Sequence, residues 1–452
     1  MKITRLSNIA LAVTLVLACA SVTFAKVSPD EAKQLGTTLT KVGAEMAGNA
    51  AGTVPPYTGG MTTLPANFDP ASGKRPDPFA NEKPLFSINA KNMGEYADKM
   101  TEATKGLMKK YPDFRIDVYP THRSVAFPEY VLDATAKNAV TAQTTDGGLG
   151  IKNAMSGVPF PIPKDGYEAM WNHLLRFDGV ADEYKFNNYY ITSSGRKIMS
   201  AAGIIHEEFP YYNKDNPDTE TYQRFKVNYT EPARRNGEAL MVVDPVNTAK
   251  NSRVAHQYLP GQRRIKLAPD IAFDTPNPGS AGMMTYDDVW VFNGSMERYD
   301  FKLIGKKELY VPYNAYKMVY QTKSADLALP HYLNPDKVRW ELHRLWVVEA
   351  TLKPGKRHIY SKRTFYLDED SWAALASDEY DARGQLFRAS FDAFTYSYDA
   401  QAPFNAAIFS YDLIANSYNL QIHLGDGGFL RYTAPYPKTE WSPESLAGSG
   451  IR

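Results

Sequence analysis

The sequence predicts an α+β protein built on a large, curved antiparallel β-sheet, with helices over its concave face and an extended N-terminal arm. Two observations lead to this fold class. From Glu183 onward, turn dipeptides separate runs of alternating apolar residues, with no long helix between them. Consecutive hairpins of this kind pair antiparallel, and a twisted sheet of about ten strands rarely stays flat.

The first 25 residues have the pattern of a secretory signal peptide. Lys2 and Arg5 form a basic start, and an apolar run follows from Ile9 to Ala20. Thr23-Phe24-Ala25 then provides the small residues that precede a signal-peptidase cut, so we expect cleavage after Ala25 and an exported chain. An alternative is a cut before Cys19, the only cysteine, which would leave a lipidated N-terminus.

Composition limits the partners that we expect. Lys and Arg number 51 against 50 Asp and Glu; without Lys2 and Arg5 the balance is 49 against 50, or −1. This near-neutral charge does not favour nucleic acid as a partner. The unusual feature is an aromatic content of 13%, which fits both strand-rich structure and a site for an apolar ligand.

The chain changes in character near residue 160. We expect one domain over 26–452, with 26–162 as a helical and extended arm and lid, and 163–452 mainly as antiparallel hairpins. Ser28-Pro29-Asp30-Glu31 predicts a capped helix start. Apolar periodicity predicts helices over Asn92–Lys110 and Pro163–Phe177, whereas Gly43–Arg75 has no periodicity and is expected to run extended.

Turns and alternation define the hairpin region. Turn dipeptides occur at Ser194-Gly195, Asn236-Gly237, Pro260-Gly261, Asn293-Gly294, Pro354-Gly355 and Arg383-Gly384. Three strands are expected to present one apolar face each: Phe225, Val227 and Tyr229; Phe394, Tyr396 and Tyr398; and Ile414, Tyr418, Leu420 and Ile422. A longer strand is predicted over Arg339–Thr351, with Trp340, Leu342, Trp346 and Val348 on one side.

The sequence carries no recognisable catalytic constellation. Nucleophile-elbow, H-E-x-x-H, Walker A and G-x-G-x-x-G patterns are all missing from it. Ser194-Gly195-Arg196-Lys197 matches S-x-x-K but falls on a predicted hairpin turn. We interpret His206-Glu207-Glu208 as a solvated hairpin edge, and Asp368-Glu369-Asp370 as a charged turn rather than a calcium site. We therefore predict no catalytic residue, no metal and no cofactor.

Long stretches of the chain resemble the DUF1329 family, in order and over nearly the whole mature length. They are Gly43 to Gly60 (GAEMAGNAAGTVPPYTGG), Pro163 to Gly179 (PKDGYEAMWNHLLRFDG), Tyr258 to Arg264 (YLPGQRR), Asp287 to Asn314 and Glu341 to Trp372. One departure is Tyr57, where the family pattern has tryptophan. The resemblance implies a LolA/LolB-like half-barrel in the envelope of Gram-negative bacteria, often described as outer-membrane lipoprotein-sorting-like, without catalytic residues.

The function expected from this resemblance is a periplasmic carrier or chaperone for a lipid or acylated molecule. The family is also associated with an outer-membrane β-barrel family (DUF1302) and an RND-type inner-membrane transporter, which are the expected protein partners. Candidate ligand-lining residues are the large aromatics of the predicted strands and of one helix, although core packing explains each of them equally well: Trp171, Trp290, Phe292, Trp340, Trp346, Phe394 and Tyr396.

Two other functions stay open. A scaffold subunit could bind an outer-membrane barrel through Gly43–Gly60 and carry nothing. An envelope hydrolase could use Glu341 and His343, which share a strand face with Arg339 and form either a buried polar network or a wet face. Of the three functions, the hydrolase has the least support in the sequence.

Overall fold

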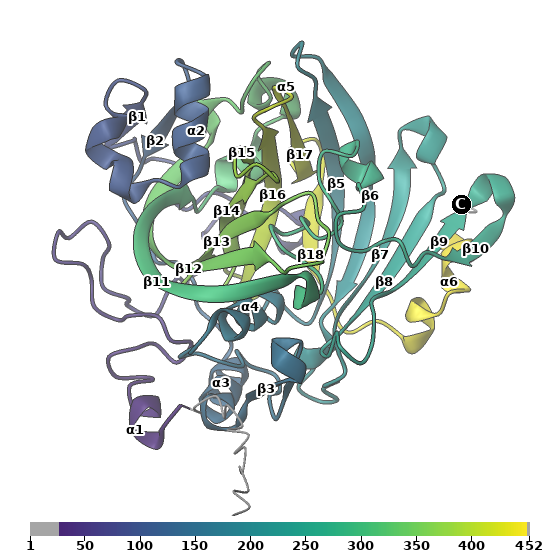
Figure 1. Cartoon of the computed structure of the whole chain (residues 1–452), viewed down its shortest axis with the longest axis horizontal. Helices are drawn as coiled ribbons and strands as arrows, with labels where there is room; N and C mark the ends of the chain where they lie inside the picture. The colour runs from purple at the N-terminus through teal and green to yellow at the C-terminus, as the bar shows by residue number, and fades with distance from the viewer. Residues whose placement is uncertain (1–26, 450–452) are drawn as a thin grey trace, which may run out of the picture.

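A computed structural model of the chain describes residues 27–449 (Figure 1), so the predicted signal peptide and Cys19 lie outside the described residues. The helices are α1 (Pro29–Ala32), α2 (Glu102–Lys110), α3 (Glu129–Thr141), α4 (Gly166–Leu174), α5 (Ser324–Leu327) and α6 (Ser445–Ser449). The strands of the hairpin region are β5 (Ala181–Ile191), β6 (Lys197–Glu208), β7 (Thr221–Glu231), β8 (Ala239–Pro245), β9 (Val254–Leu259), β10 (Arg264–Leu267), β11 (Tyr299–Pro312), β12 (Arg339–Leu352), β13 (Lys362–Asp368), β14 (Ala374–Tyr380), β15 (Leu386–Ser397), β16 (Ala402–Asp412), β17 (Ser417–His423) and β18 (Phe429–Tyr432).

These strands and two earlier ones form a single curved sheet. With β1 (Phe86–Asn89) and β2 (Arg115–Val118), the sheet has 16 strands in the order β1-β2-β12-β13-β14-β15-β16-β17-β5-β6-β7-β8-β9-β10; β11 pairs with β12, and β18 with β5. A separate hairpin joins β3 (Gln143–Thr145) to β4 (Gly150–Lys152). Figure 1 shows the sheet curling around an interior. The predicted α+β class with a large curved sheet is confirmed, with one difference: β2 pairs parallel to β12.

The predicted turns and strands fall mostly where expected. Ser194-Gly195, Asn236-Gly237 and Arg383-Gly384 lie between paired strands, and β12 covers the whole of Arg339–Thr351. Two predictions differ from the structure. Asn293-Gly294 belongs to an irregular stretch between β10 and β11, and Ile414, predicted on the strand face of Tyr418, lies exposed in the turn before β17.

The helix predictions are partly right. Ser28 caps α1 with the predicted capping box, and α4 lies inside the predicted Pro163–Phe177. The predicted helix over Asn92–Lys110 is instead a 3-10 stretch, Met93–Lys99, followed by α2. It breaks because Met100 is extended and Thr101 caps α2 through its side chain. Helix α3 has no counterpart among the predicted helices.

Helix α4 lies inside the curve of the sheet. Its Tyr167 contacts Phe301 of β11 (ring centroids 5.4 Å apart), and its Trp171 contacts Tyr222 of β7 (6.3 Å), although these strands lie far apart in the sheet order. Burial lowers the pKa of His173 to about 3, so its ring stays neutral. The His173 ring nitrogens then pair with the peptide groups of Phe292 (2.8 Å) and Ala374 (3.1 Å).

The segment Gly43–Gly60, called the arm below, packs on the sheet through its backbone. Trp372 Nε1 donates to the carbonyl of Val42 just before the arm, and Arg344 to that of Ala47. At Gly43, with φ +95°, an added Cβ would lie 1.7 Å from the carbonyl oxygen of Pro161. Glycine is therefore required there by both conformation and close approach.

Candidate functional site

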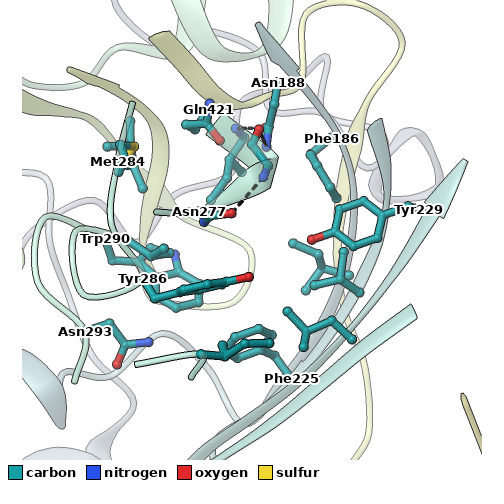
Figure 2. A pocket seen from close by; sticks show the side chains of 18 of the residues that line it. Phe186, Asn188, Phe225, Tyr229, Asn277, Met284, Tyr286, Trp290, Asn293 and Gln421 are labelled. Carbon is teal, nitrogen blue, oxygen red and sulfur yellow. Dashed lines mark hydrogen bonds between the residues drawn. The ribbon is translucent and has the colours of Figure 1, made fainter. Parts of the chain in front are cut away.

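A chamber lies between the concave face of the sheet and the segment that follows β10. Residues 268–294, called the covering segment below, cross this face without regular strands or α-helices. The volume of the chamber, taken as the space open to the centres of water molecules, is about 80 Å³. Six aromatic residues line it, together with aliphatic side chains of β6–β8 and β16–β17: Tyr184, Phe186, Phe225, Tyr229, Tyr286 and Trp290 (Figure 2).

Strand register explains why these side chains meet. Ile205 of β6 is the Cα partner of Val227 of β7, which in turn is the partner of Leu240 of β8. Successive side chains alternate across a sheet, so Phe225 and Tyr229 share the face of Val227. The predicted apolar face of this strand is thus one wall of the chamber.

The covering segment is anchored at two points. Near its middle the carbonyl of Gly279 accepts hydrogen bonds from Ser200 Oγ (2.8 Å) and Asn188 Nδ2 (3.2 Å). Closer to its C-terminal end Asp288 accepts from Arg363 Nη2 and from the hydroxyl of Tyr360, both at 2.9 Å. These contacts connect the segment to β5 and β6 on one side and to β13 and the loop before it on the other.

The backbone of the covering segment is strained where it forms the chamber wall. Trp290 and Val291 have φ of 51° and 68°, in the left-handed region. A β-branched residue such as valine rarely adopts this conformation. Trp290 packs edge-on against Phe225 across the chamber, with ring centroids 5.7 Å apart. Strain of this kind persists only where neighbouring contacts hold it, which is typical of segments that cover ligands.

The polar groups of the chamber are largely satisfied by the protein itself. Arg253 is the only charged residue among those that line it. Both oxygens of Asp244 accept from its guanidinium, at 2.6 and 3.0 Å. Burial raises the pKa of Tyr286, which keeps its hydroxyl neutral. The chamber therefore presents no uncompensated charge to a ligand.

The size of the chamber limits what it can hold in this conformation. Drug-sized ligands occupy pockets of roughly 300–1,000 Å³, well above the 80 Å³ seen here. A second hollow of about 280 Å³ shares Tyr229, Leu240, Ile271 and Tyr286 with the chamber and includes Arg234. Movement of Tyr286 and Ile271 with the covering segment would join the two spaces. We therefore call this second hollow the mouth of the chamber.

A larger groove beside α3 is a poorer candidate. Its volume is about 700 Å³, and it lies between α3 and residues 151–156. Charged side chains line it, among them Asp133, Lys137 and Lys152, which are all exposed. Apolar ligands favour enclosed sites with few charges, which the chamber provides and this groove does not.

Of the seven predicted lining residues, Trp290 lines the chamber. Trp171 donates its indole N–H to Gly148 from α4. Phe292 packs against Phe301 and Phe365, Trp340 against Phe391, Trp346 against Trp372 and Phe394 against Tyr313; Tyr396 is buried on β15. The structure thus distributes six of the seven elsewhere in the core, while the other aromatics of the chamber were not among the predicted residues.

Two expectations about charged residues need correction. Glu207 and Glu208 are not solvated, since each is only 3% exposed. The chain beyond β18 covers this edge, and Trp441 Nε1 donates to Glu208 (2.9 Å). Asp368-Glu369-Asp370 does form a turn between β13 and β14, as predicted, but it is buried.

The sequence left two alternatives for Glu341 and His343, a buried polar network or a solvent-exposed strand face. The structure shows the buried network. The two residues are 0% and 1% exposed, and His343 Nε2 lies 3.1 Å from a Glu341 oxygen. His343, Asp368 and Asp370 also bring potential metal ligands within 4.8 Å of one another. Arg123, however, already donates to both oxygens of Asp370, at 2.7 and 2.8 Å. We therefore assign this cluster to an ion network rather than to a metal centre.

A second buried acidic group lies beside the chamber. Asp182 and Glu207 are Cα partners on β5 and β6, and the hydroxyl of Tyr184, a chamber residue, donates to Glu207 (3.1 Å). Burial, reinforced by the charge of Asp178, raises the pKa of Glu207 to about 8. Glu207 is therefore largely protonated at neutral pH.

This pKa predicts a pH-dependent effect of Glu207→Gln. A carboxyl whose folded pKa is raised contributes stability below its unfolded pKa of about 4.5, and loses it as pH rises through about 8. Glutamine mimics the protonated form, so Glu207→Gln should be within about 1 kcal/mol of the wild type at pH 5 and exceed it at pH 9 by roughly 3–5 kcal/mol. Urea unfolding at both pH values measures this. Glu95→Gln, at an exposed position, should show no such trend; equal effects of Glu207→Gln at both pH values would contradict the assignment.

The fold and the chamber define a class: an open, curved-sheet protein with an aromatic cavity beneath an irregular segment. The chain belongs to the DUF1329 family, "protein of unknown function", whose profile matches residues 87–447. An uncharacterized protein of Pseudomonas aeruginosa is 39% identical over 440 residues, which is 95% of each chain. The predicted family membership is confirmed.

Solved structures with partial similarity include three bacterial proteins. A putative outer membrane lipoprotein-sorting protein domain from Vibrio parahaemolyticus is 14% identical, covering 62% of this chain and 98% of its own, with a TM-score of 0.43. A DUF1329 protein from Desulfovibrio piger is 15% identical (59% and 91%, TM-score 0.38). A LolA-superfamily protein from Nitrosomonas europaea is 10% identical (63% and 100%, TM-score 0.36). These likenesses are distant, and no ligand or function is inferred from them.

Among the described residues, none of the helices is both long and apolar enough to cross a membrane.

Proposed function

We propose that this protein is a periplasmic carrier that holds an apolar ligand in the chamber beneath the covering segment and does not transform it. The observation that carries the proposal is the enclosure of six aromatic side chains around a space without uncompensated charge. Such lining is what apolar ligands require. The leader-like N-terminus supports export, and therefore a periplasmic location.

Holding an apolar ligand by burial requires no catalytic group. Each methylene that leaves water contributes roughly 0.8 kcal/mol, so a ligand with several methylenes can be held by burial alone. Opening the covering segment would cost part of this energy, because its bonds to Asn188, Ser200 and Arg363 would have to shift. Relief of the strain at Trp290 and Val291 would offset part of that cost.

Quenching of tryptophan fluorescence tests the proposal. Of six tryptophans, Trp290 lines the chamber. A methyl ester of a dibrominated long-chain fatty acid should therefore quench Trp290 fluorescence saturably on binding. Trp290→Phe should remove most of the quenching, whereas Trp340→Phe, which changes a tryptophan packed on Phe391 outside the chamber, should retain it.

Two outcomes would count against the carrier. No saturable quenching with any apolar probe would mean that the chamber does not take ligands. Quenching that survives in Trp290→Phe but disappears in Trp340→Phe would place the ligand elsewhere.

The scaffold alternative receives less support from the structure. The arm, through which an outer-membrane barrel would be bound, already uses the carbonyl groups of Glu45 and Ala47 to accept from Arg123 and Arg344. Its exposed residues fall in separate places, at Ala47, Ala50–Thr53, Pro56 and Thr58–Gly59, so the arm presents no continuous exposed surface along the chain. Partners of this kind are compatible with a carrier that delivers its ligand to them. The hydrolase has no accessible site in Glu341 and His343, which are buried.

A further inference from the structure

We infer that the ligand carries an uncharged hydrogen-bonding group, and that this group is received at the Gln421 end of the chamber. The inference rests on the proposed carrier function and names the chemical class of its ligand. An alcohol or amide head on an apolar body fits this class, whereas a carboxylate, phosphate or ammonium head does not.

The chamber is chemically uneven. Aromatic rings surround one part, while Asn188, Asn277 and Gln421 gather at the other, as Figure 2 shows. Both amide atoms of Asn188 have a partner: its Nδ2 donates to the carbonyl of Gly279 and its Oδ1 accepts from the N–H of Ile422 (2.8 Å). The Oδ1 of Asn277 accepts from the N–H of Gly279 (2.8 Å).

Gln421 differs from its neighbours. It is 5% exposed, and its Nε2 is buried without a hydrogen-bond partner among the described residues. Two residues along the same strand face, Asn419 is fully buried and neither of its amide atoms has a partner within the described part of the chain. Burying such groups unpaired costs roughly as much as a lost hydrogen bond, so each requires an explanation. A ligand that supplies the missing partner provides one for Gln421.

The charge of the head group follows from what surrounds this end. The only charged lining residue, Arg253, is neutralised by Asp244. An ionised head would therefore be buried without a counter-ion, which is far more costly than burying a neutral one. A side-chain amide can rotate to present either its oxygen or its N–H groups, so a hydroxyl or an amide can pair with Gln421 in either sense.

The competing arrangement is insertion of the ligand tail first. An anionic amphiphile could leave its head at the mouth, beside the exposed Arg234, and place only its chain in the chamber. Gln421 would then stay unpaired. The two arrangements predict opposite preferences for charged and uncharged probes.

Competition against the brominated ester, with probes of equal medium chain length, decides between them. A primary alcohol should bind about 3- to 10-fold more tightly than the alkane, and at least about 10-fold more tightly than the carboxylate or the amine at neutral pH. An alkylphenol, added as a ring-bearing alcohol, distinguishes a cyclic from a linear ligand body. Gln421→Met keeps an unbranched side chain and should reduce the alcohol-to-alkane ratio to one or below, because the alcohol hydroxyl would then be buried without a partner.

Gln223→Met is the matched control. Gln223 is also buried on the sheet with an unpaired Nε2, but it does not line the chamber. This variant should keep the wild-type ratio. A carboxylate that binds as tightly as the alcohol, or a ratio that survives in Gln421→Met, would overturn the inference while leaving the carrier intact. Failure of every probe to bind would instead remove the carrier proposal itself.

Discussion

Arg123→Met should lower the free energy of unfolding by about 3–5 kcal/mol, because it would leave the buried carboxylate of Asp370 without the cation that neutralises it. Arg123 is 7% exposed and donates to Asp370 through two nitrogens, and its Nη2 lies 3.3 Å from a Glu369 oxygen. Its Nη1 also donates to the carbonyl of Glu45 in the arm (2.7 Å). The loss therefore affects both the β13–β14 turn and the attachment of the arm. Equilibrium unfolding in urea measures it.

Two further variants make this prediction specific. Arg383→Met removes the cation of a surface pair with Asp381, where the arginine side chain is 70% exposed, and should change stability by less than about 1 kcal/mol. Adding Asp370→Asn to Arg123→Met should restore part of the loss, because one unpaired charge is removed. If Arg123→Met is as mild as Arg383→Met, the buried network does not hold the arm.

The second large effect is expected on binding. Val227→Phe places a ring into a chamber of about 80 Å³ and should weaken binding of the brominated ester by at least about 10-fold. Val227 is 4% exposed on β7, facing Ile205 and Leu240. Overpacking should also cost roughly 1–3 kcal/mol of stability, so folding must be measured on the same samples.

Val242→Phe separates these two effects. Val242 lies on β8 opposite Phe225, is 1% exposed and is not among the residues that line the chamber. It should show the overpacking cost and keep most of the affinity. Wild-type binding by Val227→Phe would mean that the ligand site lies outside the chamber.

Much of the fold could be predicted from the sequence because its signals are local. Alternation in Phe225, Val227 and Tyr229 marks a strand face whatever its partner, and a glycine turn such as Asn236-Gly237 identifies a hairpin. Helix α3 carries no such signal: four of its residues are buried, and Thr135 and Asn138 among them are polar. Its core face therefore does not appear as an apolar stripe.

The chamber was harder to predict because it depends on contacts distant in the sequence. Trp290 belongs to a segment without periodicity, and only its position across from Phe225 makes it a wall residue. Judged by side-chain size alone, Trp340 and Trp171 were equally good candidates for the chamber wall. In the structure Trp340 packs on Phe391 in the core, and Trp171 donates to the carbonyl of Gly148. Phe225 and Tyr229 could have been included, since their shared strand face is visible in the sequence. Which aromatic faces meet a cavity depends on how the sheet curls.

The burial of charged side chains could not be predicted from the local sequence either. Nothing in His206-Glu207-Glu208 shows that a residue as distant as Trp441 folds back over Glu208. Similarly, Asp370 is buried because Arg123, distant in the chain, reaches it. Local charge patterns favour a solvated turn in both cases, and long-range packing decides otherwise.

Native mass spectrometry of the protein, isolated from periplasm without detergent, tests the carrier most directly. We predict an apolar, uncharged adduct at near-unit occupancy in the wild type, recovered by solvent extraction and lost from Val227→Phe but not from Val242→Phe. A bare protein mass, together with failure to bind any of the apolar probes afterwards, would contradict it.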